Sequence, residues 1–200
     1  MIPEGWKVGK AEDFYKINIG KTPPRKEKKW FSNKTTDNIW VSIANMGNVG
    51  MFISDSSEYL TNEAINTHNI IMVPKNTILL SFKLTVGRVS IANKELTTNE
   101  AIARFILSDD KYMEYLYLYL KKYDYNSLGS TSSIATAVNS KTIKGMKFLQ
   151  PSDDAITGFH GLINPMFERI RSLTNESSRL ASLRDTLLPR LMSGEIEVPE

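Results

Sequence analysis

The last quarter of the chain carries an apolar repeat that restricts what it can fold into. Steps of alternately three and four residues from Ile156 reach eleven positions; nine are apolar, and the exceptions are Ser177 and Arg184. A sustained period of 3.5 residues is typical of a helix that forms a coiled-coil seam. The residues predicted to form a dimer or partner interface are Phe159, Ile163, Met166, Ile170, Leu173, Leu180, Leu187 and Leu191.

The residues at the ends of this repeat predict a protruding helix over about 153–193. Pro151 ends the segment before it, and Ser152 or an aspartate can cap the helix. Pro165 predicts a kink or the start of the main helical segment, and Ser193 with Gly194 predicts the stop. An alternative is an amphipathic helix folded onto its own domain.

The part of the chain before Pro151 has many short elements, which predicts an α+β domain with a curved, mostly antiparallel sheet. We expect the domain over 1–151 and the helix over 152–200. The strand candidates are 40–43, 70–73, 77–82, 88–92, 101–107 and 146–149. A helix is predicted over 111–123, capped by Asp109 or Asp110, with five tyrosines that either pack on the core or stack on bases.

Charge is divided unevenly between the two parts. Residues 152–200 hold five basic and eight acidic residues, for a net charge of −3, so 1–151 has 20 basic and 14 acidic residues, for +6. Six of those basic residues lie in the turn-rich stretch 20–34, where they could follow a phosphate backbone. The alternative is a solvated basic loop. The predicted DNA-binding residues are Lys21, Thr22, Arg25, Lys26, Lys28, Lys29 and Lys34, with Lys83, Arg88, Ser130 and Thr131 as secondary candidates.

Residues that would support an enzyme are scarce. The chain has no cysteine, only His68 and His160 as histidines, and no glycine-rich phosphate loop. We therefore expect neither a catalytic site nor a metal or cofactor. No apolar segment resembles a signal peptide or a membrane span, so we expect a cytoplasmic protein.

Several motifs, in order along nearly the whole chain, resemble those of type I restriction-modification specificity subunits. The most specific is the closing segment 183–196, LRDTLLPRLMSGEI, which is similar to the conserved C-terminal helix of that family. The others are Ile2-Pro3-Glu4-Gly5-Trp6-Lys7, Gly20-Lys21-Thr22-Pro23, Trp40-Val41-Ser42, Leu79-Leu80-Ser81-Phe82-Lys83 with Gly87-Arg88, Asn99-Glu100-Ala101-Ile102, and Leu128-Gly129-Ser130-Thr131.

The resemblance implies one target-recognition domain and one conserved helix, whereas family members usually carry two of each. It implies a non-catalytic subunit that binds double-stranded DNA and directs methyltransferase subunits, with or without a restriction subunit, to a bipartite site. A homodimer through the C-terminal helix would supply the second half and would read a palindrome. The alternatives are a stand-alone dimeric DNA-binding regulator and an unrecognised enzyme.

Overall fold

The structure is a computed structural model that describes residues 2–48, 50–128 and 138–196. Its contacts divide the chain into two compact units, Met1–Ile163 and Asn164–Glu200, which we describe separately. The first unit contains the strands and the start of the long helix. The domain boundary expected at 151–152 remains a prediction.

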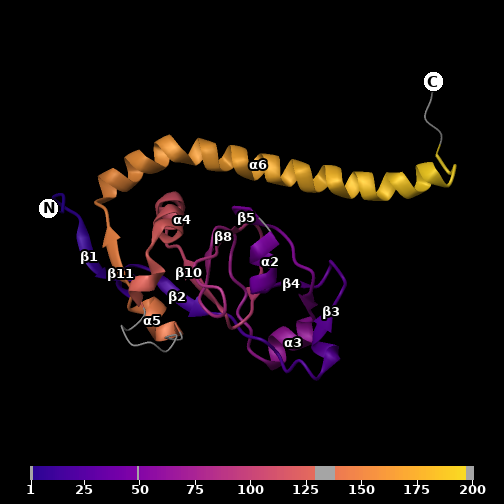
Figure 1. Cartoon of the computed structure of the whole chain (residues 1–200), viewed down its shortest axis with the longest axis horizontal. Coiled ribbons are helices and arrows are strands. Elements are labelled where there is room, and N and C mark those ends of the chain that lie inside the picture. The colour runs from indigo at the N-terminus through magenta and orange to yellow at the C-terminus, as the bar shows by residue number, and fades with distance from the viewer. Residues whose placement is uncertain (1, 49, 129–137, 197–200) are drawn as a thin grey trace. The chain divides into compact units, whose positions relative to one another are not determined.

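Eleven strands in the described part of the first unit form three sheets (Figure 1). The five-stranded sheet has the order β2-β10-β7-β8-β5, the four-stranded sheet β3-β6-β4-β9, and β1 pairs with β11. Pairing is antiparallel except for β4 with β9 and β5 with β8. The strands are β1 (Lys7–Lys10), β2 (Lys16–Ile19), β3 (Phe31–Ser32), β4 (Asn38–Val41), β5 (Phe52–Ile53), β6 (Tyr59–Leu60), β7 (Ile78–Ser81), β8 (Val89–Ala92), β9 (Thr97–Thr98), β10 (Ile102–Ile106) and β11 (Lys147–Gln150).

The helices of the first unit are short, apart from α4. They are α1 (Ala11–Phe14), α2 (Ile43–Asn48), α3 (Asn62–Thr67), α4 (Met113–Lys122) and α5 (Ser140–Lys144), with 3-10 turns η1 (Lys28–Trp30), η2 (Asp110–Tyr112) and η3 (Tyr125–Leu128). Asp109 caps η2 by accepting a hydrogen bond from the Lys111 amide, and α4 packs on β7 and β8. The predicted α+β class, the mostly antiparallel pairing and the helix near 111–123 are confirmed.

Two of the strand predictions were wrong in part. The segment 70–73 forms only an isolated bridge, between Val73 and Leu96, although Ile70 and Val73 are buried. The strand near Trp40 ends at Val41, because Ser42 turns the chain into α2: its amide and hydroxyl both donate to Asn45 Oδ1, at 2.9 and 2.7 Å. Apolar runs therefore identified buried segments there, but not their hydrogen bonding.

Two groups of buried side chains form the core that positions the candidate site. One contains Ile53, Leu79 and Ile102 of the five-stranded sheet together with Val41 of β4. The other lies on the four-stranded sheet and α3, and consists of Trp30, Trp40, Leu60, Ala64 and Ile70. The second group contains Trp30, which lies within the basic stretch, and Trp40, which follows it, so the later part of the stretch is held by packed residues.

The long helix α6 (Asp153–Met192) has 40 residues and continues through Pro165 and Pro189. The helix predicted over about 153–193 is confirmed, but Pro165 does not start its main segment. At its end, Gly194 has φ +74°, and the amides of Ser193 and Gly194 donate to the carbonyls of Pro189 and Leu191. A left-handed glycine after the last turn is the expected helix stop. Within the described residues, no helix has both the length and the apolar character of a membrane span.

Candidate nucleic-acid interface

The basic stretch leaves the five-stranded sheet at Gly20, at a point where the chain has no room for a side chain. A Cβ on Gly20 would lie 2.0 Å from the Asn99 carbonyl oxygen and 2.2 Å from Thr98 Oγ1. The close approach allows Gly20 N to donate to the Ile102 carbonyl at 3.1 Å and Lys21 N to the Thr98 carbonyl at 2.9 Å. Only glycine permits this main-chain contact.

Buried Arg104 of β10 also holds the chain where it leaves the sheet, next to Gly20. Its two terminal guanidinium nitrogens donate to the carbonyls of Ile19 and Ile71, each at 2.9 Å. Burial lowers the pKa of this guanidinium to about 10, so the group stays charged at neutral pH. Because Ile19 is the residue before Gly20, Arg104 fixes the direction in which the basic stretch leaves the sheet.

Aromatic residues hold the other end of the stretch. Trp30 is buried, its ring meets His68 edge-on with 4.8 Å between centroids, and its carbonyl accepts from the Thr61 amide. Trp40 is also buried, and its indole nitrogen donates to the Lys21 carbonyl at 3.2 Å. The loop between Gly20 and Trp30 is therefore anchored at both ends.

Arg25 is the most constrained of the predicted cations. Its guanidinium lies over the rings of Phe31 and Trp40, 4.4 and 4.5 Å from their centroids. It also forms a two-pronged ion pair with Glu58, at 2.7 and 3.0 Å. Arg25 and Glu58 line a pocket of about 360 Å³ with Lys28, Phe31, Ser32 and Asn33. A guanidinium held flat in this way presents a fixed fork of donors, the geometry that recognises guanine or phosphate.

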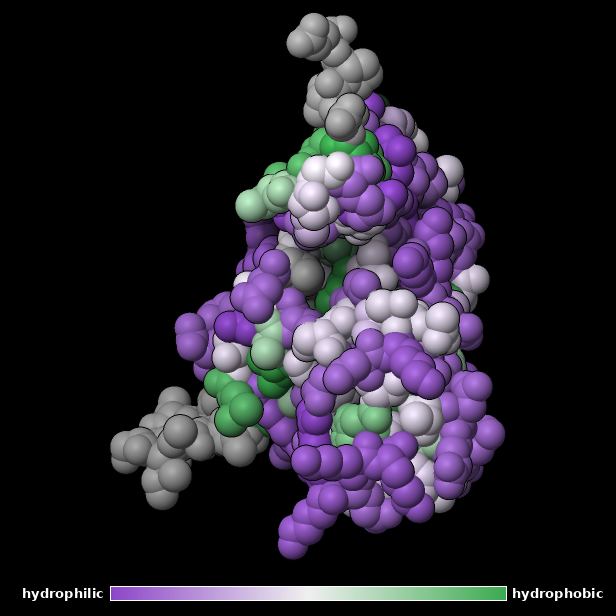
Figure 2. Space-filling model, turned by 90° about the vertical axis from the view of Figure 1, so that its right-hand side faces the viewer, coloured by the Kyte–Doolittle hydropathy of each residue, from purple (hydrophilic) through white to green (hydrophobic). Residues whose placement is uncertain are grey.

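The remaining lysines of the stretch are exposed. In the described part of the chain, the side chains of Lys26, Lys28 and Lys34 have neither a hydrogen bond nor an ion pair, whereas Lys29 lies 4.1 Å from the Trp30 ring centroid and 3.9 Å from Glu27. Figure 2 shows that hydrophilic residues cover most of the end of the domain that carries β3 and α3. Unpaired lysines on such a surface can neutralise phosphates without first breaking an internal contact.

Glu100, which lies between β9 and β10, contacts the basic loop. It accepts a short hydrogen bond from the Thr22 hydroxyl, and the charges of Lys83 and Arg25 also act on it. Burial alone would raise the pKa of Glu100, but the Thr22 hydrogen bond, a backbone hydrogen bond and the charges of Lys83 and Arg25 together lower it. Of the residues predicted from the sequence, Thr22 therefore contacts Glu100 directly, and the charges of Lys83 and Arg25 favour its ionised form.

Lys83 begins the turn between β7 and β8, whose tip has an unusual residue. Leu84 has φ +61° and its side chain is 99% exposed. Ser81 supports the turn, because its hydroxyl donates to the Thr85 carbonyl and accepts from the Arg88 amide. A leucine in the left-handed region costs about 1–2 kcal/mol, and full exposure adds no compensating burial. Sequence reasoning missed Leu84 because no apolar periodicity includes it.

The other secondary candidates have different positions. Arg88 donates to the Ile43 carbonyl at 2.8 Å and packs against Gly47, which gives it a structural contact within the domain. Lys21 donates to the His68 carbonyl at 2.6 Å, at the end of α3. Ser130 and Thr131 lie outside the described residues. Among the residues that the structure describes, no group of three or more histidine or acidic side chains could hold a metal ion.

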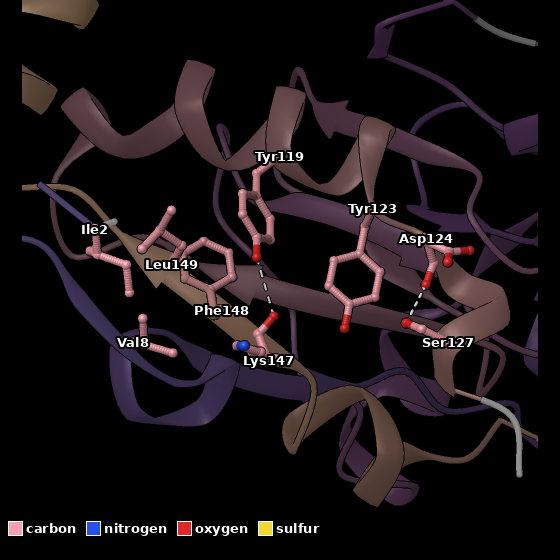
Figure 3. Close-up of a pocket in the computed structure, with 9 residues that line it drawn as sticks. All are labelled: Ile2, Val8, Tyr119, Tyr123, Asp124, Ser127, Lys147, Phe148 and Leu149. Carbon is pink, nitrogen blue, oxygen red and sulfur yellow. Dashed lines mark hydrogen bonds between the residues drawn. The ribbon is translucent and has the colours of Figure 1, made fainter.

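The tyrosines of α4 support the packing alternative. The hydroxyls of Tyr115 and Tyr119 donate to the carbonyls of Leu149 and Lys147 on β11, at 2.5 and 3.2 Å. Burial raises the pKa of both phenols, so they remain protonated donors. Figure 3 shows Tyr119 and Tyr123 extending from α4 toward β11, over a pocket of about 390 Å³ that Ile2 and Val8 also line.

Comparison with known proteins identifies the fold and the family. Residues 3–155 match the family described as the type I restriction modification DNA specificity domain. The chain belongs to this family.

Two curated relatives and several solved structures agree with this membership. The specificity subunit of the type I restriction enzyme HindI from Haemophilus influenzae is 32% identical over 200 residues, which are 98% of this chain and 42% of that protein. The specificity subunit of MjaIX from Methanocaldococcus jannaschii is 32% identical over 121 residues, 60% of this chain and 27% of that protein. This specificity domain and its helix thus span less than half the length of the relatives they match.

Solved structures show the same fold at low sequence identity. The HsdS subunit from Thermoanaerobacter tengcongensis has a TM-score of 0.58 at 13% identity, covering 98% of this chain and 47% of that one. The S subunit from M. genitalium gives 0.61 at 15%, covering 96% and 46%. The specificity-domain fold with its long helix is thereby established.

Proposed function

We propose that this chain is the non-catalytic part of a type I restriction-modification system that recognises one half of a bipartite duplex DNA site. Its task is then to place methyltransferase subunits, with or without a restriction subunit, at that site. The observation that supports this most is the anchored basic loop, whose exposed Lys26, Lys28 and Lys34 lie beside the fixed Arg25. The specificity subunits that it resembles belong to restriction enzymes.

The loop supports two kinds of contact with DNA. Lysine ammonium groups bind phosphates and give affinity that is independent of sequence. Arg25, with Ser32 and Asn33 in the same pocket, offers polar groups that suit base edges in the major groove. Such a contact would require Glu58 to release Arg25. Before DNA binds, the ion pair between Arg25 and Glu58 would hold the guanidinium in a fixed orientation.

We also propose that the apolar seam of α6 forms a homodimer and a platform for methyltransferase subunits. Met166, Ile170, Leu173 and Leu180 are all exposed, and an apolar stripe of this length favours a partner. Two recognition domains related by a two-fold axis would read a palindrome. A stand-alone regulator is less favoured, because both curated relatives are subunits of restriction enzymes.

Exchange of Lys26, Lys28 and Lys29 for alanine tests the DNA surface. Binding to all duplexes should weaken, and the slope of log affinity against log salt should flatten by about 0.9 for each lysine that contacts phosphate. Titration of fluorescent duplexes over a range of salt concentrations measures both. A change of less than about twofold at about 50 mM salt would rule this loop out as the contact.

The matched control changes the same amount of charge elsewhere. Lys7 and Lys10 lie on β1 and Lys16 begins β2, away from the β3 and α3 end of the domain in Figure 1. Exchange of these three for alanine should leave affinity and salt slope close to those of the unmodified chain. Copurification with a methyltransferase subunit from the host tests the partner: a chain that binds DNA alone and recruits no such subunit would be a regulator.

A further inference from the structure

We infer that Glu58 determines specificity: it keeps the Arg25 guanidinium from phosphate and releases it to a G·C base pair. Arg25 then binds the guanine of that pair, and Glu58 binds the amino group of its cytosine. This rests on the DNA recognition proposed above and adds the base pair that is read and the residue that excludes phosphate. The pocket concerned has a volume of about 360 Å³ and is lined by Arg25, Lys28, Phe31, Ser32, Asn33 and Glu58.

Two aromatic rings fix the plane of the Arg25 guanidinium. Its central carbon lies 4.4 Å from the ring centroid of Phe31 and 4.5 Å from that of Trp40. The two rings meet edge-on, with 5.7 Å between their centroids, and Trp40 is buried in the core of the domain. A guanidinium that already stacks on rigid rings loses little freedom when it binds an acceptor.

The backbone of Trp40 also sets the position of Glu58. The Trp40 amide donates to the Glu58 carbonyl at 3.2 Å, and the Glu58 amide donates to Ser56 Oγ at 3.3 Å. The Ser56 hydroxyl in turn donates to the Trp40 carbonyl at 2.6 Å. The residue that stacks on Arg25 therefore also holds the main chain that carries its carboxylate partner.

The ion pair occupies the donors that a base would need. Arg25 Nη1 and Nη2 donate to the two carboxylate oxygens of Glu58, at 2.7 and 3.0 Å. The two side chains are 51% and 37% exposed, so DNA can reach both. Ion pairs with this much exposure add little net stability, so the pair can open at small cost when a suitable acceptor arrives.

Phosphate is a poor replacement for Glu58. It would exchange one anionic partner of Arg25 for another, and the released carboxylate would then lie close to the phosphate charge. Lys28 is a second cation in the pocket, so the pocket would attract phosphate if Glu58 were neutral. Glu58 therefore lowers the affinity of this pocket for the DNA backbone, whatever the sequence.

A G·C pair instead offers a partner to both side chains. In the major groove, guanine presents the acceptors O6 and N7, which arginine binds with two hydrogen bonds, and cytosine presents an amino donor to a carboxylate. An A·T pair has an amino donor where guanine has O6, and an acceptor where cytosine has its amino group. The fixed order of donor and acceptor in Arg25 and Glu58 therefore favours G·C.

Selection of bound duplexes from a random library tests the base pair that is read. The unmodified chain should prefer G·C at one position, and Arg25→Ala should lose about tenfold of that preference while the other positions keep theirs. Arg25→Lys should not restore it, because an ammonium group has no planar fork of donors. Loss of preference at every position, or at none, would overturn the assignment of one base pair to Arg25.

A modified base checks the same contact from the side of the DNA. Replacement of the preferred guanine by 7-deazaguanine removes the N7 acceptor. It should weaken binding of the unmodified chain and leave binding of Arg25→Ala unchanged. An equal loss of affinity in both chains would show that another residue binds this guanine.

Glu58→Gln tests the exclusion of phosphate. Affinity for a duplex without the preferred site should rise, and the slope of log affinity against log salt should steepen by about 0.9 as Arg25 gains a phosphate. The ratio of specific to non-specific affinity should fall roughly tenfold, because the discrimination at one base pair is lost. A gain of non-specific affinity cannot result from damage to the fold.

Glu63→Gln is the matched control, because it removes the same charge from an exposed residue of α3, which packs on the same four-stranded sheet. It should leave the ratio of the two affinities and the salt slope close to those of the unmodified chain. An equal response to Glu58→Gln and Glu63→Gln would be a general effect of charge and would overturn the role of Glu58. Weaker binding of Glu58→Gln to both duplexes would also overturn it, since the ion pair would then only hold the loop.

The lysine variants separate this inference from the function on which it rests. If exchange of Lys26, Lys28 and Lys29 weakens DNA binding while the Arg25 and Glu58 variants leave base preference unchanged, the pair reads no base and the recognition function stands. If the unmodified chain binds no duplex at about 50 mM salt, the recognition function fails and the inference fails with it.

Discussion

At the scale of single residues, Leu84 combines backbone strain with exposure in a way that suits contact with a partner. Its left-handed backbone costs energy that no buried contact returns, and it follows Lys83, whose charge lowers the pKa of Glu100. Strain of this kind concentrates at functional positions. An apolar tip beside cations fits a thymine methyl group or a step between stacked bases.

Leu84→Gly separates these two properties. Glycine accepts the positive φ, so the free energy of unfolding should stay the same or rise by up to about 1 kcal/mol. Loss of the side chain should weaken binding to the specific duplex more than to a random duplex. Urea unfolding and DNA titration measure the two effects; unchanged affinity for the specific duplex would show that the tip does not touch DNA.

Sequence reasoning found which residues are basic but not which are free. Lys26, Lys28 and Lys34 look no different in the sequence from Lys21 and Arg88, yet the last two bind carbonyls of α3 and α2 in the folded domain. Glu58 and Glu100 could not be assigned to the site, because their positions beside Arg25 and Thr22 depend on contacts 33 and 78 residues apart in the chain. Long-range pairing of this kind leaves no periodic signal.

At the scale of elements, the contact between Glu114 and His160 ties α4 to the start of α6. Glu114 is fully buried, and its Oε2 lies within hydrogen-bond distance of His160 Nδ1, at 2.9 Å. A buried carboxylate that loses such a partner costs about 1–3 kcal/mol. The pair therefore contributes to the orientation of the first turns of α6 on the domain.

A double-mutant cycle should detect this coupling. His160→Ala should lower the free energy of unfolding by about 1–3 kcal/mol, because it leaves the carboxylate buried without that hydrogen bond. Glu114→Met together with His160→Ala should lose less than the sum of the single changes. Urea denaturation gives the four values, and strict additivity would show that the two residues do not interact energetically.

The elements also show where local sequence is a sufficient guide. The heptads located α6 and the capping aspartate located η2 and α4, since both signals lie within a few turns of chain. The pentapeptide Thr-Asn-Glu-Ala-Ile gives the opposite lesson: at 61–65 Thr61 caps α3, and at 98–102 the same letters connect β9 to β10. There, pairing with β4 and β7 decides the structure, and neither partner is local.

At the scale of the whole molecule, the proposed homodimer would make the length of α6 set the distance between two recognition domains. Its 40 residues correspond to about 60 Å of helix. The bases between the two half-sites would then be spanned without being read. The sequence predicts the helix from its heptads, but the bases that are recognised depend on loop conformations that have no local signature.

Insertion of one heptad after Leu173 tests whether the helix sets this distance. Seven residues lengthen the helix by roughly 10 Å, and at 3.4 Å per base pair the preferred spacer should grow by about three base pairs. Selection of bound duplexes from a library with variable spacers measures the preference. An unchanged spacer would show that the distance between half-sites is not set by the helix.

The anchoring of the basic loop has a consequence for how such a protein changes over time. At one end, the amides of Gly20 and Lys21 donate main-chain hydrogen bonds, and Gly20 leaves room for this close approach. At the other end, the Trp30 carbonyl accepts a main-chain hydrogen bond, and both Trp30 and Trp40 are buried. Between them, the exposed side chains of Lys26 and Lys28 form neither a hydrogen bond nor an ion pair with the rest of the described domain. Mutation or recombination could therefore exchange the exposed residues of this short stretch while the surrounding fold is inherited intact; if the loop contacts DNA as proposed, the preferred target would change with them.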